Sequence, residues 1–304
     1  MFLINYSQII LALILLINAP LLHAQSTASL ERISYTSEAD ESKREFLLYL
    51  PKGYQDDPKK KWPVMMFLHG NGERGNGTTE LDFVMVHGPL YEAWIQKRDL
   101  PFIIIAPQLH MFGRDKYAKY LAERTLDQLP KRLETGVPPR EPKWVIDTLM
   151  QGSPADEVYP YKSYGPPMGW EQVESDLLNM LDQVNTNYQT DQSRIYLTGL
   201  SYGGFGTWYM GSKHAELFAA ISPVVGWGHK DLMKPLAENK VPIWCFAGGR
   251  DLVIKEQYFY PGLNELEKLG HEVRFTVEAD MGHDTWKRVY AGGDLYAWFL
   301  AQRK

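Results

Sequence analysis

Residues 194–206 read RIYLTGLSYGGFG, and this stretch predicts a strand, a tight turn and a helix in succession. The apolar run 195–198 favours a strand, and residues 205–210 favour a helix. Glycines stand two residues before and two residues after Ser201, where so tight a turn leaves no room for side chains. We therefore expect Ser201 to be held above a sheet, where the first N–H groups of the helix can stabilise an oxyanion. The alternative is a glycine-rich loop with an incidental serine, and the rest of the chain must decide between the two.

Length and composition favour one large α/β domain with a full core. The chain has 304 residues, of which 44% are hydrophobic and 13% aromatic, and a net charge of −5. Such mild acidity gives no reason to expect nucleic acid or an anionic membrane as partner.

The first 24 residues have the composition of an export signal. An apolar stretch covers residues 9–22, and Ala24 precedes a polar run at the expected cleavage point. We expect residues 1–24 to be a signal peptide. After its cleavage, we expect the remaining chain to be a bacterial periplasmic or secreted protein without a membrane partner. An uncleaved signal anchor is the alternative. The single cysteine, Cys245, lies in an apolar run and is expected to be a core thiol without a disulfide.

Strand and helix patterns alternate along residues 25–304, the predicted catalytic domain. An antiparallel hairpin is expected at 33–36 and 45–50. The other expected strands are 63–68, 102–106, 195–198, 219–225, 241–247 and 272–278, and the main expected helices are 90–97, 171–188, 205–210, 256–269 and 294–302. Continuous apolar strands separated by helices predict a mainly parallel twisted sheet with helices on both faces.

Residues 109–170 depart from this alternation. Eight of the 19 prolines fall here, residues 115–129 favour a helix, and the segment ends with several aromatic residues. A connection this long in a compact domain is usually functional or disordered, and its aromatic content favours the functional interpretation. We interpret it as a lid-like insertion over the carboxyl edge of the sheet, where ligands bind in open α/β folds.

Ser201, Asp251 and His283 occur in this order, each just after a predicted strand. The carboxyl ends of parallel strands share one edge, so the three side chains should meet there. A neutral imidazole can take the serine proton and return it to a leaving group, and a carboxylate fixes the imidazole tautomer. Asp280 and Asp284 compete for the role of the acid, but they are sequence neighbours of the histidine, so the separate strand end at Asp251 is preferred.

The loop HGNGERG at residues 69–75 follows a buried strand and is the expected source of a second oxyanion N–H, with Asn71 as candidate. His69 invites a catalytic interpretation, but a structural role, holding the loop by a side-chain hydrogen bond, is preferred. Glu73 and Arg74 either form an ion pair that fixes the loop or are solvated.

Several stretches together resemble secreted bacterial serine esterases of the α/β-hydrolase superfamily, in the feruloyl-esterase-like, phospholipase/carboxylesterase group. Many members are labelled predicted peptidases or prolyl-oligopeptidase-family hydrolases. The matching stretches are LPKGY (50–54), HGNGERG (69–75), 102–108, 196–208, GRD (249–251) and GHDTW (282–286). The resemblance implies Ser201 as nucleophile with Asp251 and His283, and an oxyanion hole from the N–H groups of Asn71 and Tyr202. It also implies carboxylic-ester substrates, often acyl or feruloyl groups on plant polysaccharides.

Three function classes follow from these observations. The first is hydrolysis of a carboxylic ester, with Trp227, Trp286 and Tyr164 as candidates for contact with the substrate. The second is a serine peptidase, for which the roughly 30 residues before the first predicted strand leave no room for a gating domain. The third is a non-catalytic binding protein, which the complete triad disfavours. No metal-ligand spacing is present, so neither a metal nor a cofactor is expected.

Overall fold

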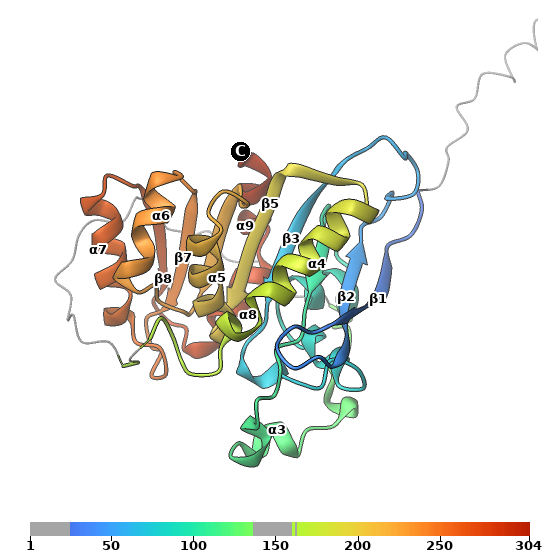
Figure 1. The fold of residues 1–304 in the computed structure, drawn as a ribbon, viewed down its shortest axis with the longest axis horizontal. Helices are drawn as coiled ribbons and strands as arrows, with labels where there is room; N and C mark the ends of the chain where they lie inside the picture. Colours follow the sequence, from blue (N-terminus) through green and yellow to red (C-terminus); the bar gives the residue numbers. More distant parts are fainter. Residues whose placement is uncertain (1–24, 136–159, 162) are drawn as a thin grey trace, which may run out of the picture.

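The computed structural model describes residues 25–135, 160–161 and 163–304. Within these residues, eight strands form one sheet (Figure 1). They are β1 Ser29–Thr36, β2 Lys43–Leu50, β3 Trp62–Leu68, β4 Ile103–Ala106, β5 Thr190–Leu200, β6 Ala220–Val224, β7 Ile243–Gly248 and β8 Val273–Glu278. The predicted signal peptide and residues 136–159 of the predicted insertion lie outside the described residues. Within the described ranges, no helix combines the length and the apolar character that crossing a membrane requires.

The strand order is β1-β2-β4-β3-β5-β6-β7-β8, and the sheet is mainly parallel, as the sequence predicts. The β1–β2 hairpin is antiparallel and lies at one edge, and β2 also pairs antiparallel with β4. All pairs from β4 through β3 to β8 are parallel. Each parallel strand therefore ends at the same edge, which receives every loop expected to carry a functional residue.

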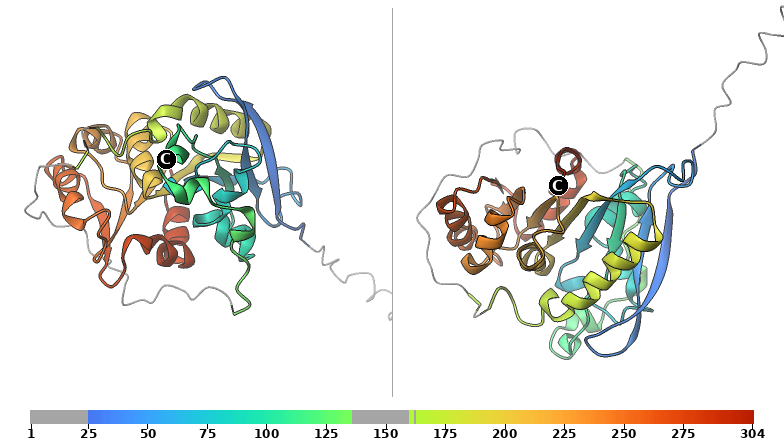
Figure 2. Two further views of the ribbon diagram at one scale, coloured as in Figure 1. Left: turned by 90° about the horizontal axis from the view of Figure 1, so that it is seen from below. Right: turned by 45° about the horizontal axis from the view of Figure 1, so that its top comes forward.

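Alternate residues of the strands supply two cores, one on each face of the sheet. Val64, Met66 and Leu68 face one core, while Met65 and Phe67 face the other. Helices α4 Glu174–Asn187, α5 Tyr202–Lys213, α6 Met233–Glu238 and α7 Tyr260–Lys268 cover the first face; α2 Gly88–Leu90, α8 Trp286–Ala291 and α9 Asp294–Ala301 cover the second (Figures 1 and 2). Burial on both faces explains why the strands are apolar throughout rather than alternating.

Two helix predictions were inaccurate. Residues 115–129 do not form one helix but three short turns, of which only α3, Lys119–Ala122, is α-helical. Tyr117 and Tyr120 are 88% and 60% exposed, so these two rings are not buried against a core. Residues 286–291, for which no helix was predicted, form α8, which starts three residues after His283 and packs Tyr290 into the second core.

The turn at Ser201 has the strained geometry that its glycines imply. Ser201 has φ 52° and ψ −114°, a conformation that side-chain-bearing residues rarely adopt. A Cβ atom on Gly203 would lie 1.8 Å from the carbonyl oxygen of Leu68, and one on Gly199 would lie 2.4 Å from the carbonyl oxygen of Gly203. The start of α5 therefore presses directly against the end of the neighbouring strand β3.

We expect Gly203→Ala to destabilise the protein by more than about 2 kcal/mol, because the backbone of Leu68 must move to admit one methyl group. Gly72→Ala is the control, since a Cβ there meets nothing within 4 Å, and it should cost less than about 1 kcal/mol. Urea unfolding followed by circular dichroism measures both. Equal midpoints for the two variants would contradict the crowding argument.

Candidate active site

Three side chains from three strand ends form one hydrogen-bonded chain at the carboxyl edge of the sheet. His283 Nε2 lies 3.0 Å from Ser201 Oγ, and His283 Nδ1 lies 2.8 Å from Asp251 Oδ2. Ser201 follows β5, Asp251 follows β7 and His283 follows β8. An imidazole between a hydroxyl and a carboxylate can accept the hydroxyl proton while the carboxylate stabilises the resulting cation.

The backbone around Asp251 fixes its carboxylate. Its side chain is fully buried, and Oδ1 accepts hydrogen bonds from the N–H groups of Val253 and Ile254 at 2.8 and 2.9 Å. Oδ2 is thereby directed at Nδ1 of His283, which must carry the proton, so Nε2 is left as the acceptor for Ser201.

The two rival acids have other partners. Asp280 binds both terminal nitrogens of Arg288, at 2.6 and 2.8 Å, and these hydrogen bonds lower its pKa to about 2. Asp284 is half exposed and binds Lys287 at 3.1 Å. The structure therefore brings Asp251, rather than Asp280 or Asp284, to the histidine.

The two candidate oxyanion residues both stand at helix starts. Tyr202 is the first residue of α5, and Asn71 is the first residue of a short 3₁₀ helix, Asn71–Glu73. The first N–H groups of a helix have no acceptor within that helix, so both can donate to a ligand. The N–H of Ser201 itself is engaged, because it donates to the carbonyl oxygen of Val224 at 2.9 Å.

His69 is a buried structural element of the loop at 69–75. Its Nε2 accepts the N–H of Leu109 at 2.9 Å, and its Nδ1 lies 2.6 Å from the carbonyl oxygen of Gly70, to which it donates. Burial lowers its pKa to about 3, which keeps the ring neutral. The indole N–H of Trp170 donates to the carbonyl oxygen of His69 at 3.2 Å and fixes the loop from the other side.

Glu73 and Arg74 are both buried and have separate partners. They therefore neither form an ion pair with each other nor are solvated, which corrects both expectations. Arg74 Nε donates to Asn71 Oδ1 at 2.6 Å, and its guanidinium lies 4.7 Å from the ring centre of Tyr202. The carboxylate of Glu73 faces two imidazoles instead, with His69 Nδ1 and His87 Nε2 each 3.8 Å away. Arg74 thus connects the two candidate oxyanion residues.

The predicted insertion also holds the loop at 69–75. Arg124 NH1 donates to the carbonyl oxygen of Gly72 at 2.5 Å, and NH2 donates to that of Arg74. Tyr120 receives a hydrogen bond from the side-chain amide of Asn71. Sequence reasoning missed these contacts, because an arginine in an irregular segment belongs to no motif and carries no sign of which carbonyl groups it reaches.

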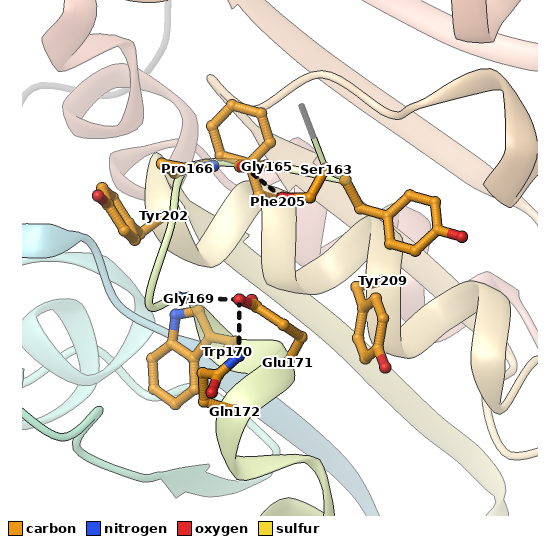
Figure 3. A pocket seen from close by; sticks show the side chains of 11 residues that line it. Ser163, Gly165, Pro166, Gly169, Trp170, Glu171, Gln172, Tyr202, Phe205 and Tyr209 are labelled. Carbon is orange, nitrogen blue, oxygen red and sulfur yellow. Dashed lines mark hydrogen bonds between the residues drawn. The ribbon is translucent and has the colours of Figure 1, made fainter. Parts of the chain in front are cut away.

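A cavity of about 200 Å³ lies beside α5, with Tyr202 and Tyr209 at opposite ends and Glu171 between them (Figure 3). Tyr164, a candidate substrate contact, lines it. Ser163, Gly165, Pro166, Gly169 and Trp170 of the predicted insertion line it as well. Glu171 accepts a hydrogen bond from the N–H of Gly169 at 3.1 Å, so its position is fixed.

The other two candidate substrate contacts have different environments. Trp227 is fully buried and packs between Tyr161 and Phe205, so it offers no surface to a substrate, which corrects that expectation. Trp286 lies edge-on to His283, with ring centres 5.2 Å apart, and lines a second cavity.

Glu73 makes folding stability depend on pH. Burial raises its pKa from 4.5 to about 7, so between these values the folded protein keeps a proton that the unfolded chain has lost. Stability contributed by this proton is therefore present at low pH and lost as the pH rises. We expect the stability gain of Glu73→Gln over wild type to be about 1–3 kcal/mol larger at pH 8 than at pH 5.

Urea unfolding at both pH values measures this gain, and exposed Glu123→Gln is the control. The control should change stability equally at both values. A pH-independent effect of Glu73→Gln would mean that Glu73 is ionised throughout.

Sequence comparisons match parts of the chain. Residues 169–233 match the prolyl oligopeptidase family. A poly(3-hydroxyalkanoate) depolymerase C of Paucimonas lemoignei is 39% identical over 51 residues, which are 17% of this chain and 12% of that protein. A bifunctional acetylxylan esterase/xylanase of Neocallimastix patriciarum is 29% identical over 119 residues, which are 39% of this chain and 17% of that protein. The chain therefore matches less than a fifth of the length of these curated relatives.

Solved structures match over most of the chain. A thermostable esterase superposes with a TM-score of 0.59 at 20% identity, over 90% of this chain and 63% of that one. A ferulic acid esterase of Anaeromyces mucronatus superposes with a TM-score of 0.51 at 19% identity, over 90% of both chains. The sheet order, the strained serine turn and these superpositions together show that the chain has the α/β-hydrolase fold.

Proposed function

We propose that this chain hydrolyses carboxylic esters, with Ser201 as nucleophile, His283 as general base and acid, and Asp251 as the partner that orients the imidazole. The observation that carries the proposal is the continuous hydrogen-bonded chain from Ser201 Oγ through His283 to the buried carboxylate of Asp251. The two helix-start N–H groups of Asn71 and Tyr202 complete the arrangement as the oxyanion hole.

The reaction proceeds in two halves. Ser201 Oγ attacks the ester carbonyl carbon while its proton passes to His283 Nε2, and the carbonyl oxygen becomes an oxyanion held by the N–H groups of Asn71 and Tyr202. The bond to the alcohol then breaks, and the same proton leaves with the alcohol. Water repeats the sequence on the acyl-enzyme and releases the acid and free Ser201.

The comparisons support an ester rather than another substrate. One of the two curated relatives is an acetylxylan esterase/xylanase and the other a poly(3-hydroxyalkanoate) depolymerase, and both structural neighbours are esterases. We propose acyl or feruloyl esters as substrates, including esters carried on a plant polysaccharide. We also propose that residues 1–24 direct export to the periplasm or medium, and that the insertion at 109–170 selects substrates as a lid.

A serine peptidase is the second candidate, because residues 169–233 match the prolyl oligopeptidase family. A panel of p-nitrophenyl acetate, methyl ferulate, acetylated xylan and peptide anilides separates the candidates. Ester hydrolysis without anilide cleavage supports the esterase, and faster cleavage of anilides than of esters supports the peptidase.

We expect Ser201→Ala to lower kcat for p-nitrophenyl acetate by about 10⁶-fold, because the nucleophilic oxygen is removed while the oxyanion hole and binding contacts remain. A fluorophosphonate probe should label the wild type once, at Ser201, and should not label the variant. Labelling at another residue, or retained turnover in the variant, would exclude Ser201 as nucleophile.

We expect Asp251→Asn to lower kcat by about 10⁴-fold, because the amide favours the wrong imidazole tautomer. Asp284→Asn is the matched control, since Asp284 is half exposed and bound to Lys287, and it should change kcat by less than about threefold. Steady-state kinetics on a small ester measure both. The reverse order of effects would move the role of the acid to Asp284.

A further inference from the structure

A second cavity, of about 320 Å³, lies on the His283 side of the candidate site. This volume is at the lower end of the range for small-molecule pockets, which suits a group of about one ring. Four of its lining residues carry aromatic rings. The lining residues that matter here are His87, Tyr91, Leu133, Trp286 and Tyr290.

Trp286 connects this cavity with the candidate site. Its ring centre lies 5.2 Å from that of His283 and 5.3 Å from that of His87, so the indole contacts both imidazoles. Trp286 also begins α8, the helix that follows the His283 loop. A substrate held at Ser201 can therefore place a substituent beside Trp286 without leaving the neighbourhood of the imidazole.

The charged groups at the cavity are paired or neutral. Glu92 binds Arg98 at 2.8 Å, and Lys287 binds Asp284 at 3.1 Å. Burial lowers the pKa of His87 to about 4, so its ring is uncharged at neutral pH. An uncharged apolar group thus meets no unpaired charge on these three residues and can contact the edges and faces of several rings.

The predicted insertion contributes the outer wall. Gln128, Pro130 and Leu133 line the cavity, and the N–H of Leu133 donates to the side-chain oxygen of Gln96 at 3.2 Å. Gln96 in turn donates to the hydroxyl of Tyr91 at 2.6 Å. These two hydrogen bonds connect Leu133 of the outer wall, through Gln96, to Tyr91 of the inner wall.

We propose that this cavity binds one uncharged aromatic ring of the ester substrate, and that Leu133 of the insertion determines its size. The proposal rests on the ester hydrolysis proposed above. The ring can belong to the acyl group or to the alcohol, and the two sources are separated by experiment.

The experiment fills the cavity with Leu133→Trp. Leu126→Trp is a matched control, because Leu126 lies in the same segment, is also 46% exposed and does not line the cavity. Both variants and the wild type are assayed by proton release on four esters. Methyl ferulate carries its ring in the acyl group, benzyl acetate carries it in the alcohol, ethyl hexanoate carries a flexible chain, and ethyl acetate carries neither.

Leu133→Trp should lower kcat/KM for one of the two aromatic esters by about 10- to 100-fold and leave ethyl acetate within about threefold. The ester that is affected identifies the source of the ring. Leu126→Trp should leave all four esters unchanged within the same limit. Leu133→Phe fills less space and should give a smaller loss in the same order.

Three results for Leu133→Trp overturn the proposal. The first is an unchanged kcat/KM for both aromatic esters, and the second is an equal loss of kcat/KM on ethyl acetate while the circular dichroism stays native. The third is a loss of kcat/KM on ethyl hexanoate as large as that on the aromatic ester. The last would mean that the cavity takes a chain rather than a ring. Failure of the proposed function itself has a different signature, namely a wild type that hydrolyses none of the four esters.

Discussion

The close approach of α5 to β3 is the constraint on which the functional edge of this molecule depends. Gly203 lies so near the carbonyl oxygen of Leu68 that no side chain fits between them, and Gly199 is confined in the same way. The chain can turn from strand to helix in this space only with Ser201 in a strained conformation. As a result, the hydroxyl group and the N–H of Tyr202 are both presented at the carboxyl edge, next to the loop that follows β3.

That loop is held by contacts from distant parts of the chain. Neutral His69 ties it to the end of β4 through Leu109, and Trp170 donates to its backbone from the far end of the insertion. Arg124 reaches two of its carbonyl groups from the near end. Buried polar groups need partners, and here those partners come from the insertion. The position of the Asn71 N–H is therefore coupled to the folding of the insertion.

The same insertion contributes to both cavities. Tyr164 and its neighbours border the cavity beside Tyr202, and Leu133 borders the cavity beside Trp286. A single inserted segment therefore borders two cavities without being part of the hydrogen-bonded chain of Ser201, His283 and Asp251. Folds of this kind commonly carry function on loops that surround a rigid framework.

The sequence by itself determined the sheet, the order of its main elements and the residues at the candidate centre. Continuous apolar strands, glycines around one serine, and polar residues just after strand ends are local patterns, and parallel strands must end together at one edge. The sequence preferred Asp251 as the partner of His283, but only the tertiary structure shows that Asp280 and Asp284 bind Arg288 and Lys287 instead. The tertiary structure also decided that Trp227 is buried and that Arg124 holds a loop some 50 residues away in the chain. Such contacts join residues that share no local pattern, so no spacing along the chain could have predicted them.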